Sequence, residues 1–357
     1  MRFPEFSGEW KKCKLGDLCN VLMCKRILVS QTNTEDGVPF YKIGTIGSTP
    51  DAYISKELFD DYKVKYNYPR KGEVMITCAG TVGKCVVYDG EDAYFQDSNI
   101  VWIDNPTQYI SNGFLFHLLS KVDWRKLNST TIIRIYNDDL RNLKMSYPRK
   151  EEQQKISHLL SLLDERIATQ NKIIEKLQSL IKGLAAQLTQ SGTPNIRLCD
   201  CLECHSSTLL ENCVSVTGSY PVYGATGLIG YTNNYAYNGE SILIVKDGSG
   251  VGSLSYVNDH FSVIGTLNYL TAKENYSILY LYYALMAFNF TPYITGMAIP
   301  HIYFKDYGKA KLFYPSIEKR IRIASLLHNI EQKLVVEQNL VISLSTQKSY
   351  LLRMLFI

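Results

Sequence analysis

The strings that come nearest to catalytic motifs are incomplete in this sequence. An adenine methyltransferase needs an Asn/Asp-Pro-Pro-Tyr/Phe corner, whereas residues 104–109 read Asp-Asn-Pro-Thr-Gln-Tyr, without the second proline and with the aromatic residue too late. A phosphate-binding loop needs Gly-x4-Gly-Lys-Ser/Thr, and the segment from Gly80 to Lys84 is too short and precedes a predicted strand. We interpret both segments as ordinary turns and predict no catalytic residue.

One group of acidic residues is weak evidence for the active site of a metal-dependent nuclease. Asp51 follows a proline, and Asp61 and Lys63 follow ten and twelve residues later, in an order that can hold a metal ion and polarise water. However, residues 54–62 read as a solvent-exposed helical turn between strands. The helical interpretation is favoured, and no metal site is predicted here.

A cluster of possible zinc ligands lies at residues 199–205, where Cys199, Cys201, Cys204 and His205 occur close together, with Cys213 nearby. Thiolates and imidazoles are the usual zinc ligands. Against this, Leu198-Cys199-Asp200 falls where Leu15-Gly16-Asp17 lies in an earlier copy of the same pattern, and that copy has no cluster of ligands. Small buried thiols are therefore the favoured interpretation and zinc the alternative.

Glycine-flanked loops at residues 77–84 and 246–253 are better candidates for function, because glycines allow close approach to a phosphate backbone. Reading of bases needs amide, hydroxyl or guanidinium groups on exposed loops or strand ends. For any single residue, a solvated surface role is the competing interpretation. The predicted DNA-binding residues are Lys42, Thr45, Thr81, Lys84, Gln96, Asn99, Arg134 and Asn137 in the first half of the chain, and Thr226, Asn233, Asn234, Lys246, Ser249, Asn268, His301 and Lys305 in the second.

Composition limits the class of protein. With 357 residues, 46% of them hydrophobic, the chain is long enough for two domains with real cores. The net charge of +4 permits binding to nucleic acid without requiring it. No signal-peptide pattern opens the sequence and no apolar run is long enough to span a bilayer, so we expect a cytoplasmic protein whose nine cysteines are reduced.

The sequence contains an internal duplication, in which the same pattern occurs twice about 167 residues apart. Short strands separated by glycines fill each half, and Gly72 to Lys84 matches Gly239 to Ser253 with two extra residues in the second loop. Each half then has a Tyr-Pro pair, at 147–148 and 314–315, followed by a long helical pattern.

Both helical patterns place apolar residues at alternating steps of three and four, which is typical of a coiled-coil seam. One polar residue interrupts each seam at the same place. Lys348 also departs from the apolar pattern in the second. The seam residues are Ile156, Leu160, Leu163, Ile167, Gln170, Ile174, Leu177, Ile181 and Leu184 in the first helix, and Ile323, Leu327, Ile330, Leu334, Glu337, Val341, Leu344 and Leu351 in the second.

These patterns predict the arrangement of the helices. A helix of about 39 residues is roughly 58 Å long, so the first would carry the chain from one domain to the next and the second would return, antiparallel to it. Gln170 and Glu337 would then meet and set the register. Such a rod is long enough to separate two DNA-reading heads by roughly 34 Å, one turn of duplex. Pairing with a helix of another chain is the alternative.

This pattern resembles the specificity (S) subunits of type I restriction-modification systems. The most specific segments are Pro148 to Ile156, Leu163 to Ile167 and Tyr220 to Tyr231, and the resemblance covers the whole chain. It implies an α+β fold with two β-rich target-recognition domains in pseudo-twofold repeat, separated by two long antiparallel coiled-coil helices. The expected division is target-recognition domain 1 at 1–149, spacer helix 1 at 150–190, target-recognition domain 2 at 191–315 and spacer helix 2 at 316–357.

The resemblance also implies partners and cofactors. Such a subunit is non-catalytic and binds double-stranded DNA together with two methyltransferase (M) subunits, which use S-adenosylmethionine, and with restriction (R) subunits, which use ATP and Mg²⁺. No cofactor is expected in this chain. Ile173, Leu180 and Val335 lie off the seam and are candidates for docking M subunits. The rival interpretation is a non-catalytic scaffold whose twin β-rich domains bind proteins.

Overall fold

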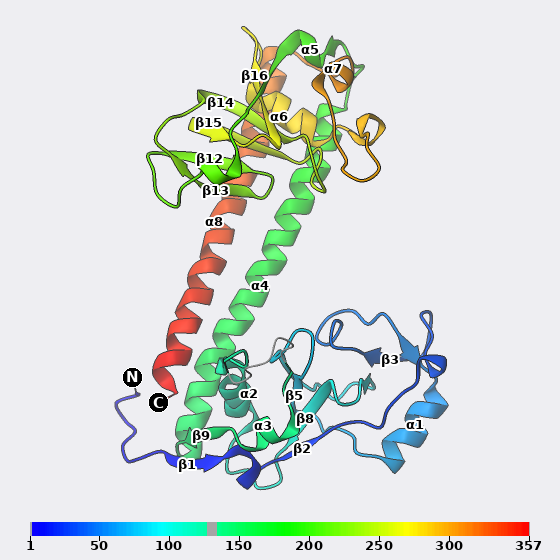
Figure 1. Ribbon diagram of the computed structural model, residues 1–357, viewed down its shortest axis with the longest axis vertical. Coiled ribbons are helices and arrows are strands. Elements are labelled where there is room, and N and C mark those ends of the chain that lie inside the picture. The colour runs from blue at the N-terminus through cyan, green and yellow to red at the C-terminus, as the bar shows by residue number, and fades with distance from the viewer. Residues whose placement is uncertain (1, 127–133, 357) are drawn as a thin grey trace. The chain divides into compact units, whose positions relative to one another are not determined.

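The computed structural model describes residues 2–126 and 134–356, which form two compact units (Figure 1). Unit 1 comprises Met1–Thr169 and Val341–Ile357, and unit 2 comprises Gln170–Leu340. The two predicted long helices are confirmed as α4 (Lys150–Thr189) and α8 (Ile317–Leu355). Because the units divide inside these helices, the four-part division at residues 149, 190 and 315 stays a prediction. In the described residues, every helix is too short or too polar to cross a membrane.

Unit 1 is built on a central sheet whose inner strands are buried on both faces. Val74 and Ile76 point into one core with Phe114 of helix α2, whereas Met75 and its cross-strand neighbour Trp102 point into a second core. This two-sided burial explains why the strands read as continuous apolar runs. The elements are β1 (Lys11–Lys14), β2 (Asn20–Leu22), β3 (Val38–Tyr41), β4 (Tyr53–Ile54), α1 (Lys56–Lys65), β5 (Val74–Thr77), β6 (Cys85–Val87), β7 (Tyr94–Phe95), β8 (Ile100–Asp104), α2 (Asn112–Lys121), α3 (Asn137–Arg141) and β9 (Lys144–Tyr147). The sheets have the orders β2-β8-β5-β6, β4-β3-β7 and β1-β9.

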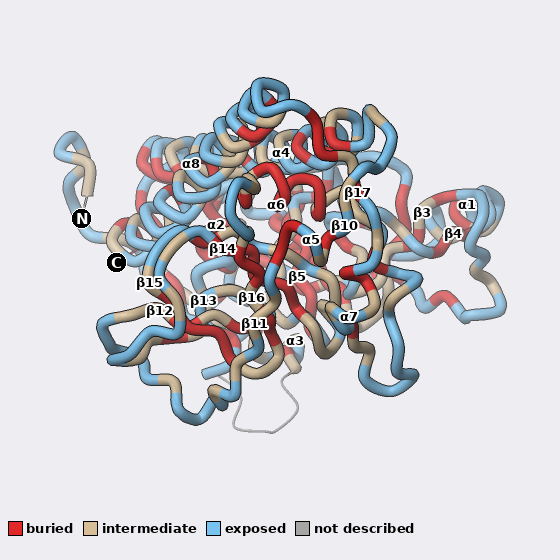
Figure 2. Tube along the Cα trace, turned by 90° about the horizontal axis from the view of Figure 1, so that it is seen from above, coloured by how far each residue is buried: buried red, intermediate tan, exposed pale blue. Residues whose placement is uncertain are grey.

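Unit 2 repeats this plan in a larger sheet. Ile242 and Ile244 belong to a core shared with α6 and α8, and Leu243 belongs to a second core. Figure 2 shows buried residues along β14, β16 and α6. The sheets have the orders β11-β16-β14-β15-β12-β13 and β10-β17. The elements are β10 (Ile196–Arg197), α5 (Leu198–Cys201), β11 (Leu202–Ser206), β12 (Tyr220–Gly224), β13 (Gly227–Thr232), β14 (Tyr237–Val245), β15 (Leu254–Val263), β16 (Leu267–Ala272), α6 (Ile278–Met286), α7 (Phe304–Tyr307) and β17 (Lys311–Leu312), with single-turn helices at Glu211–Cys213 and Thr291–Tyr293.

Strand order confirms the duplication and corrects its alignment. The order β2-β8-β5-β6 of unit 1 matches β11-β16-β14-β15 of unit 2. Each unit also contains one parallel pair, β3 with β7 in the separate three-stranded sheet of unit 1 and β12 with β15 in the large sheet of unit 2. The sequence match placed Met75 against Ile242. In the structure Met75 lies opposite Trp102, and Leu243 lies opposite Tyr269, the residue equivalent to Trp102. One of the two extra residues therefore lies between Gly239 and Leu243, inside β14, where a one-residue shift keeps the correct side chains facing each core.

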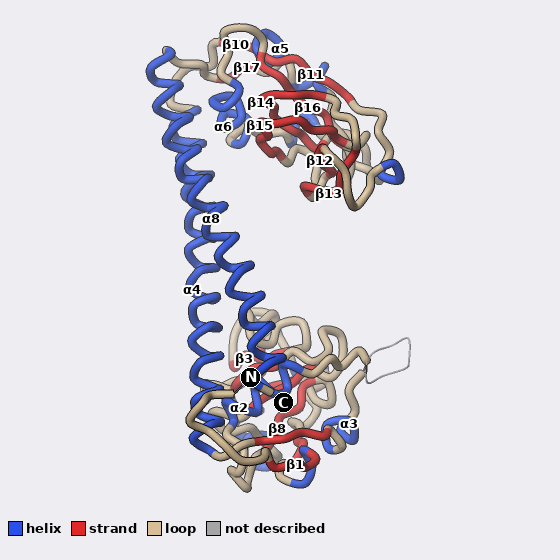
Figure 3. Tube along the Cα trace, turned by 90° about the vertical axis from the view of Figure 1, so that its left-hand side faces the viewer, coloured by secondary structure: helices blue, strands red, loops and turns tan. Residues whose placement is uncertain are grey.

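Helices α4 and α8 pair with each other within each unit, and Figure 3 shows their traces side by side. Every predicted seam residue is buried or half-buried, including Ile156 and Leu160 at one end of α4 and Ile181 at the other. In unit 2, Nε2 of Gln170 donates a hydrogen bond to Glu337, and both side chains are buried. The predicted antiparallel pairing and polar contact are thus confirmed, and the intermolecular alternative is not needed to bury the seam.

Lys348, the irregular seam position, has a specific partner. Its ammonium group bonds to Oδ1 of Asp164 in unit 1, so the charge is neutralised at the edge of the seam. Oδ2 of the same carboxylate lies 4.0 Å from Nδ1 of His117, a fully buried side chain of α2. Nε2 of His117 lies 3.4 Å from the Ser161 hydroxyl, and Nδ1 has no hydrogen-bond partner. Burial lowers the pKa of His117 to about 4, despite the opposing effect of Asp164.

The buried Gln170–Glu337 contact should fix the register in which α4 and α8 pair, but it should make the pair less stable than an apolar seam would. Glu337→Leu alone leaves the Gln170 amide without its partner, and we expect it to lower the free energy of unfolding by about 1–3 kcal/mol. The double variant Gln170→Leu/Glu337→Leu should recover the wild-type value or exceed it, because the seam becomes apolar throughout. Urea unfolding of the full chain measures both. Gln338→Leu, at an exposed neighbouring position, is the control, and a double variant as unstable as Glu337→Leu would contradict the prediction.

Acid should destabilise unit 1 through His117. Its pKa is about 4 in the folded chain, below the value of about 6.5 expected when unfolded, so the unfolded state binds more protons between these values. Stability should therefore fall as pH drops from about 6.5 towards 4, by up to about 3 kcal/mol. Thermal unfolding across this range should show a shallower pH dependence for His117→Leu. A variant of the exposed His158 in α4 should keep the wild-type slope, and equal slopes for wild type and His117→Leu would refute the assignment.

Candidate nucleic-acid interface

In unit 1 the glycine-flanked loop between β5 and β6 is held in a fixed shape. The Cys78 amide donates to the Asn99 carbonyl at 2.7 Å, and the Ile135 amide donates to the Cys78 carbonyl at 2.9 Å. Gly83 has a φ of +84°, and an added Cβ would lie 2.2 Å from Cδ1 of Trp124. Three segments far apart in sequence therefore meet at the end of β5, and the turn requires glycine.

Most of the residues predicted to bind DNA in the first half converge on this point. Nζ of Lys84 donates to the Ile46 carbonyl at 2.5 Å, which joins the β5–β6 loop to the turn after β3. That turn contains Lys42 and Thr45, whose hydroxyl accepts from the Lys42 amide at 3.0 Å. Together, the predicted residues brought into this cluster are Lys42, Thr45, Thr81, Lys84, Gln96, Asn99 and Arg134, and Asn137 follows close by at the start of α3.

Arg26 belongs with this cluster and is absent from the predicted set. Its guanidinium lies 4.0 Å from Oδ2 of Asp97 and is 73% exposed. With Lys42 and Gln96 it lines a hollow of about 290 Å³. The sequence signal that could have identified Arg26 as a DNA-binding candidate is the adjacent pair Lys25-Arg26, which lies in a segment without a strand pattern. The sequence does not show that Arg26 lies beside Asp97, because only the fold brings these two residues together.

Unit 2 has an equivalent cluster with different side chains. The Ile302 amide donates to the Lys246 carbonyl at 2.9 Å, just as Ile135 does to Cys78 in unit 1, so Lys246 stands where unit 1 has Cys78. By the same equivalence His301 stands where unit 1 has Arg134. Ser249 lies in the same loop, Lys305 is exposed on α7, and Thr226 lies on the exposed β12–β13 turn.

Three predicted residues of unit 2 lie outside this cluster. Asn233 and Asn234 are exposed and line a separate hollow of about 630 Å³ together with Ser262. Asn268 is buried, and its side chain accepts a hydrogen bond from the Ser206 hydroxyl at 3.0 Å and donates to the Cys204 sulfur at 3.2 Å. Its amide is occupied within the domain, so we leave Asn268 out of the proposed interface.

Asn105 and Asp61, which belong to strings that resembled catalytic motifs, make structural contacts within unit 1. The Asn105 side chain is buried and donates to the Ile110 carbonyl at 2.6 Å, which stabilises the turn before α2. Asp61 lies in α1, as the helical interpretation predicted, and pairs with Lys65. Among the residues the structure describes, no three metal-ligating side chains come together. The Cys201 thiol is buried, and burial raises its pKa to about 12.

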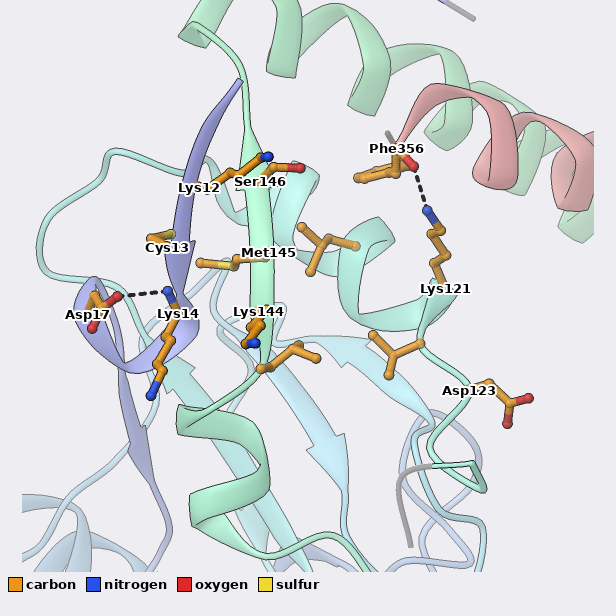
Figure 4. A pocket seen from close by; sticks show the side chains of 13 residues that line it. Lys12, Cys13, Lys14, Asp17, Lys121, Asp123, Lys144, Met145, Ser146 and Phe356 are labelled. Atoms are coloured by element: carbon orange, nitrogen blue, oxygen red, sulfur yellow. Dashed lines mark hydrogen bonds between the residues drawn. The ribbon is translucent and has the colours of Figure 1, made fainter. Parts of the chain in front are cut away.

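A hollow of about 860 Å³ lies elsewhere on unit 1, between the β1–β9 ribbon, the end of α2 and the end of α8 (Figure 4). Nζ of Lys121 donates to the Phe356 carbonyl at 2.6 Å, and burial lowers the pKa of Lys121. Lys12, Lys14 and Lys144 also line the hollow. None of the predicted DNA-binding residues does, so it is a surface distinct from the loop cluster.

Comparison with known proteins assigns the family. A model of the type I restriction modification DNA specificity domain matches residues 7–179 and 196–344, which is most of the chain and both halves of the repeat. The chain belongs to the type I restriction-modification specificity family. This agrees with the expectation of a specificity subunit rather than a catalytic one.

Curated relatives within this family are specificity subunits. A putative type I restriction enzyme specificity subunit of Haemophilus influenzae is 48% identical over 172 residues, 48% of this chain and 44% of the relative. The EcoprrI specificity subunit of Escherichia coli is 28% identical over 112 residues, 31% of this chain and 28% of the relative. The alignments thus span less than half the length of these relatives.

Solved structures support the fold of the specificity family over the whole chain. The S subunit of a type I restriction-modification system from M. genitalium has a TM-score of 0.69 and 18% identity, covering 98% of this chain and 96% of that one. A structure concerned with complex assembly and conformational transition of the type I system has a TM-score of 0.52, 16% identity and 97% coverage of both chains. At these identities the likeness shows the fold alone.

Proposed function

We propose that this chain is the sequence-specific DNA-binding subunit of a type I restriction-modification complex. Each β-rich unit reads one half of a bipartite site, and the paired helices α4 and α8 fix the spacer between the halves. The chain itself catalyses no reaction. It directs adenine methylation by two M subunits, which use S-adenosylmethionine, and cleavage by R subunits, which use ATP and Mg²⁺, and it acts in the cytoplasm.

The observation that carries this proposal is a pair of equivalent loop clusters with different chemistry. Both are built by the same backbone hydrogen bonds, Ile135 to Cys78 in unit 1 and Ile302 to Lys246 in unit 2. The side chains differ, since Arg134 is replaced by His301 and Cys78 by Lys246. A guanidinium and an imidazole favour different base edges. One scaffold with two sets of side chains is suited to an asymmetric two-part site.

Cations in both clusters suit a phosphate backbone. Lys84 and Arg134 lie in the unit 1 cluster, and Lys246 and Lys305 lie in that of unit 2. Contacts of this kind supply affinity without sequence preference and weaken as salt rises. We propose that they hold the duplex while the neighbouring amide and hydroxyl groups read bases.

We propose that M subunits dock on the apolar residues of α4 and α8 that point away from the seam. Ile173, Leu180 and Val335 are 38%, 46% and 43% exposed, in contrast to the buried seam residues nearby. Ile342 and Tyr350 are more exposed, at 64% and 56%. Exposed apolar side chains repeated along paired helices are typical of protein interfaces.

Comparing methylomes of the host with and without this gene tests the function. We expect one bipartite adenine-methylation motif to disappear when the gene is deleted, and the assembled complex to bind that motif with an affinity that falls steeply as salt rises. If no motif is lost and the complex binds no duplex, the protein-scaffold interpretation is favoured instead. Methylation or cleavage by the purified chain alone would overturn the partner-dependent role.

Deleting one heptad from α4, Lys172 to Gln178, tests the role of the helices. Removal of seven residues keeps the seam on one face while shortening the helix by about 10 Å, because each residue contributes about 1.5 Å. We expect the methylated motif to keep both half-sites but to change its spacer, or binding to be lost. Methylome sequencing reads the result. An unchanged motif with full affinity would contradict the spacer role.

A further inference from the structure

The loop at residues 294–303, which connects the single-turn helix at Thr291–Tyr293 to α7, has an apolar tip. Met297 is fully exposed, Ile299 is 65% exposed and Ile294 is 38% exposed. Isolated exposed apolar side chains are common, but three within six residues of one loop indicate a binding surface. A partner is needed to remove this tip from water.

The tip is held in a defined shape by its own backbone. The Thr295 amide donates to the His301 carbonyl at 2.9 Å, and the His301 amide returns a hydrogen bond at 2.8 Å. Gly296 has a φ of +89°, and an added Cβ would lie 2.3 Å from the Ile299 carbonyl oxygen. Because the loop is already ordered, insertion of its tip into a partner costs little conformational entropy.

The loop is also fastened to the proposed DNA-binding cluster of unit 2. The Gly248 amide donates to the Pro300 carbonyl at 2.9 Å, and the next contact along is the hydrogen bond from Ile302 to the Lys246 carbonyl. Nζ of Lys305 lies 5.0 Å from the centre of the Tyr303 ring, so a second cation follows the tip. The apolar tip therefore stands beside the cations that would hold phosphates.

An apolar side chain flanked by cations is the combination used by proteins that insert a wedge between base steps and unstack them. An apolar surface of a protein partner could bury the tip, but it would not explain why Lys246 and Lys305 lie next to it. The phosphate backbone accounts for the lysines, and the base stack accounts for the methionine and isoleucine.

We propose that Met297, supported by Ile299, inserts between two base pairs of the half-site bound by unit 2, while Lys246 and Lys305 contact the flanking phosphates. This inference rests on the proposed function and adds a DNA deformation to it. The site would then be read partly through the ease with which one base step unstacks, in addition to direct contacts with base edges.

The test uses the complex assembled with M subunits and duplexes carrying its methylation motif. A fluorescent adenine analogue, whose emission rises on unstacking, is placed in turn at each step of both half-sites. We expect a rise at one step with the wild-type complex, loss of that rise with Met297→Ala, and its retention with Met297→Leu. Affinity should fall on the order of tenfold for Met297→Ala, which corresponds to about 1.4 kcal/mol. Val216→Ala, at a 90% exposed apolar position of the same unit, should match wild type.

The outcomes separate this inference from the proposed function. If the wild-type complex binds the motif but no step becomes unstacked, or if Met297→Ala unstacks it equally, the wedge is refuted and sequence-specific binding stands. If Met297→Ala instead reduces the amount of M subunit recovered with this chain, the tip contacts protein and the inference is wrong. If the wild-type complex binds no duplex, the proposed function itself fails.

Discussion

The apolar seam between α4 and α8 is continuous with the core of each unit, and this continuity is the constraint on which the rest of the structure depends. In unit 1, Ile156 and Leu160 of α4 and Leu355 of α8 belong to the same core as the β5–β8 strands and α2. In unit 2, Ala185 and Leu327 join the core of β14, β16 and α6. Each buried leucine or isoleucine contributes about 1.5–3 kcal/mol, so neither sheet can shift on its helices without exposing shared core.

Polar contacts fix the register of α4 against α8, which the apolar seam alone does not determine. An apolar heptad pattern tolerates a slip by one repeat, whereas the Gln170–Glu337 and Asp164–Lys348 contacts each exist in one register only. Glu331 of α8 adds a third contact, accepting hydrogen bonds from the hydroxyls of Tyr282 and Tyr283 at 2.8 and 2.7 Å and so fastening α6 to α8. Burial, with the adjacent carboxylate, raises the pKa of both tyrosines, which stay neutral donors.

The same framework also allows the two halves to diverge where they meet DNA in the proposed function. The first turns of α4 and α8 show that different side chains can make the same contact with the backbone at equivalent positions. Nε2 of Gln153 donates to the Pro148 carbonyl at 2.9 Å, and a guanidinium nitrogen of Arg320 donates to the Pro315 carbonyl at 2.7 Å, the equivalent contact in the second copy. The loop clusters use the same freedom more widely, because the two clusters share main-chain hydrogen bonds, Ile135 to Cys78 and Ile302 to Lys246, while the side chains around those bonds differ.

The sequence by itself determined the features that depend on short-range periodicity. The steps of three and four predicted the seam, and every predicted position is buried or half-buried. The polar interruption predicted the Gln170–Glu337 contact, and the repeat predicted two units of one topology, because these signals lie in the spacing of neighbouring residues. Tertiary structure alone decided which loops meet. Asn268 is buried, Lys348 has a partner, β14 is shifted by one residue, Arg26 lies beside Asp97, and Met297 is exposed. The first four depend on pairings between segments tens of residues apart, and residue type and local spacing carry no record of such pairings.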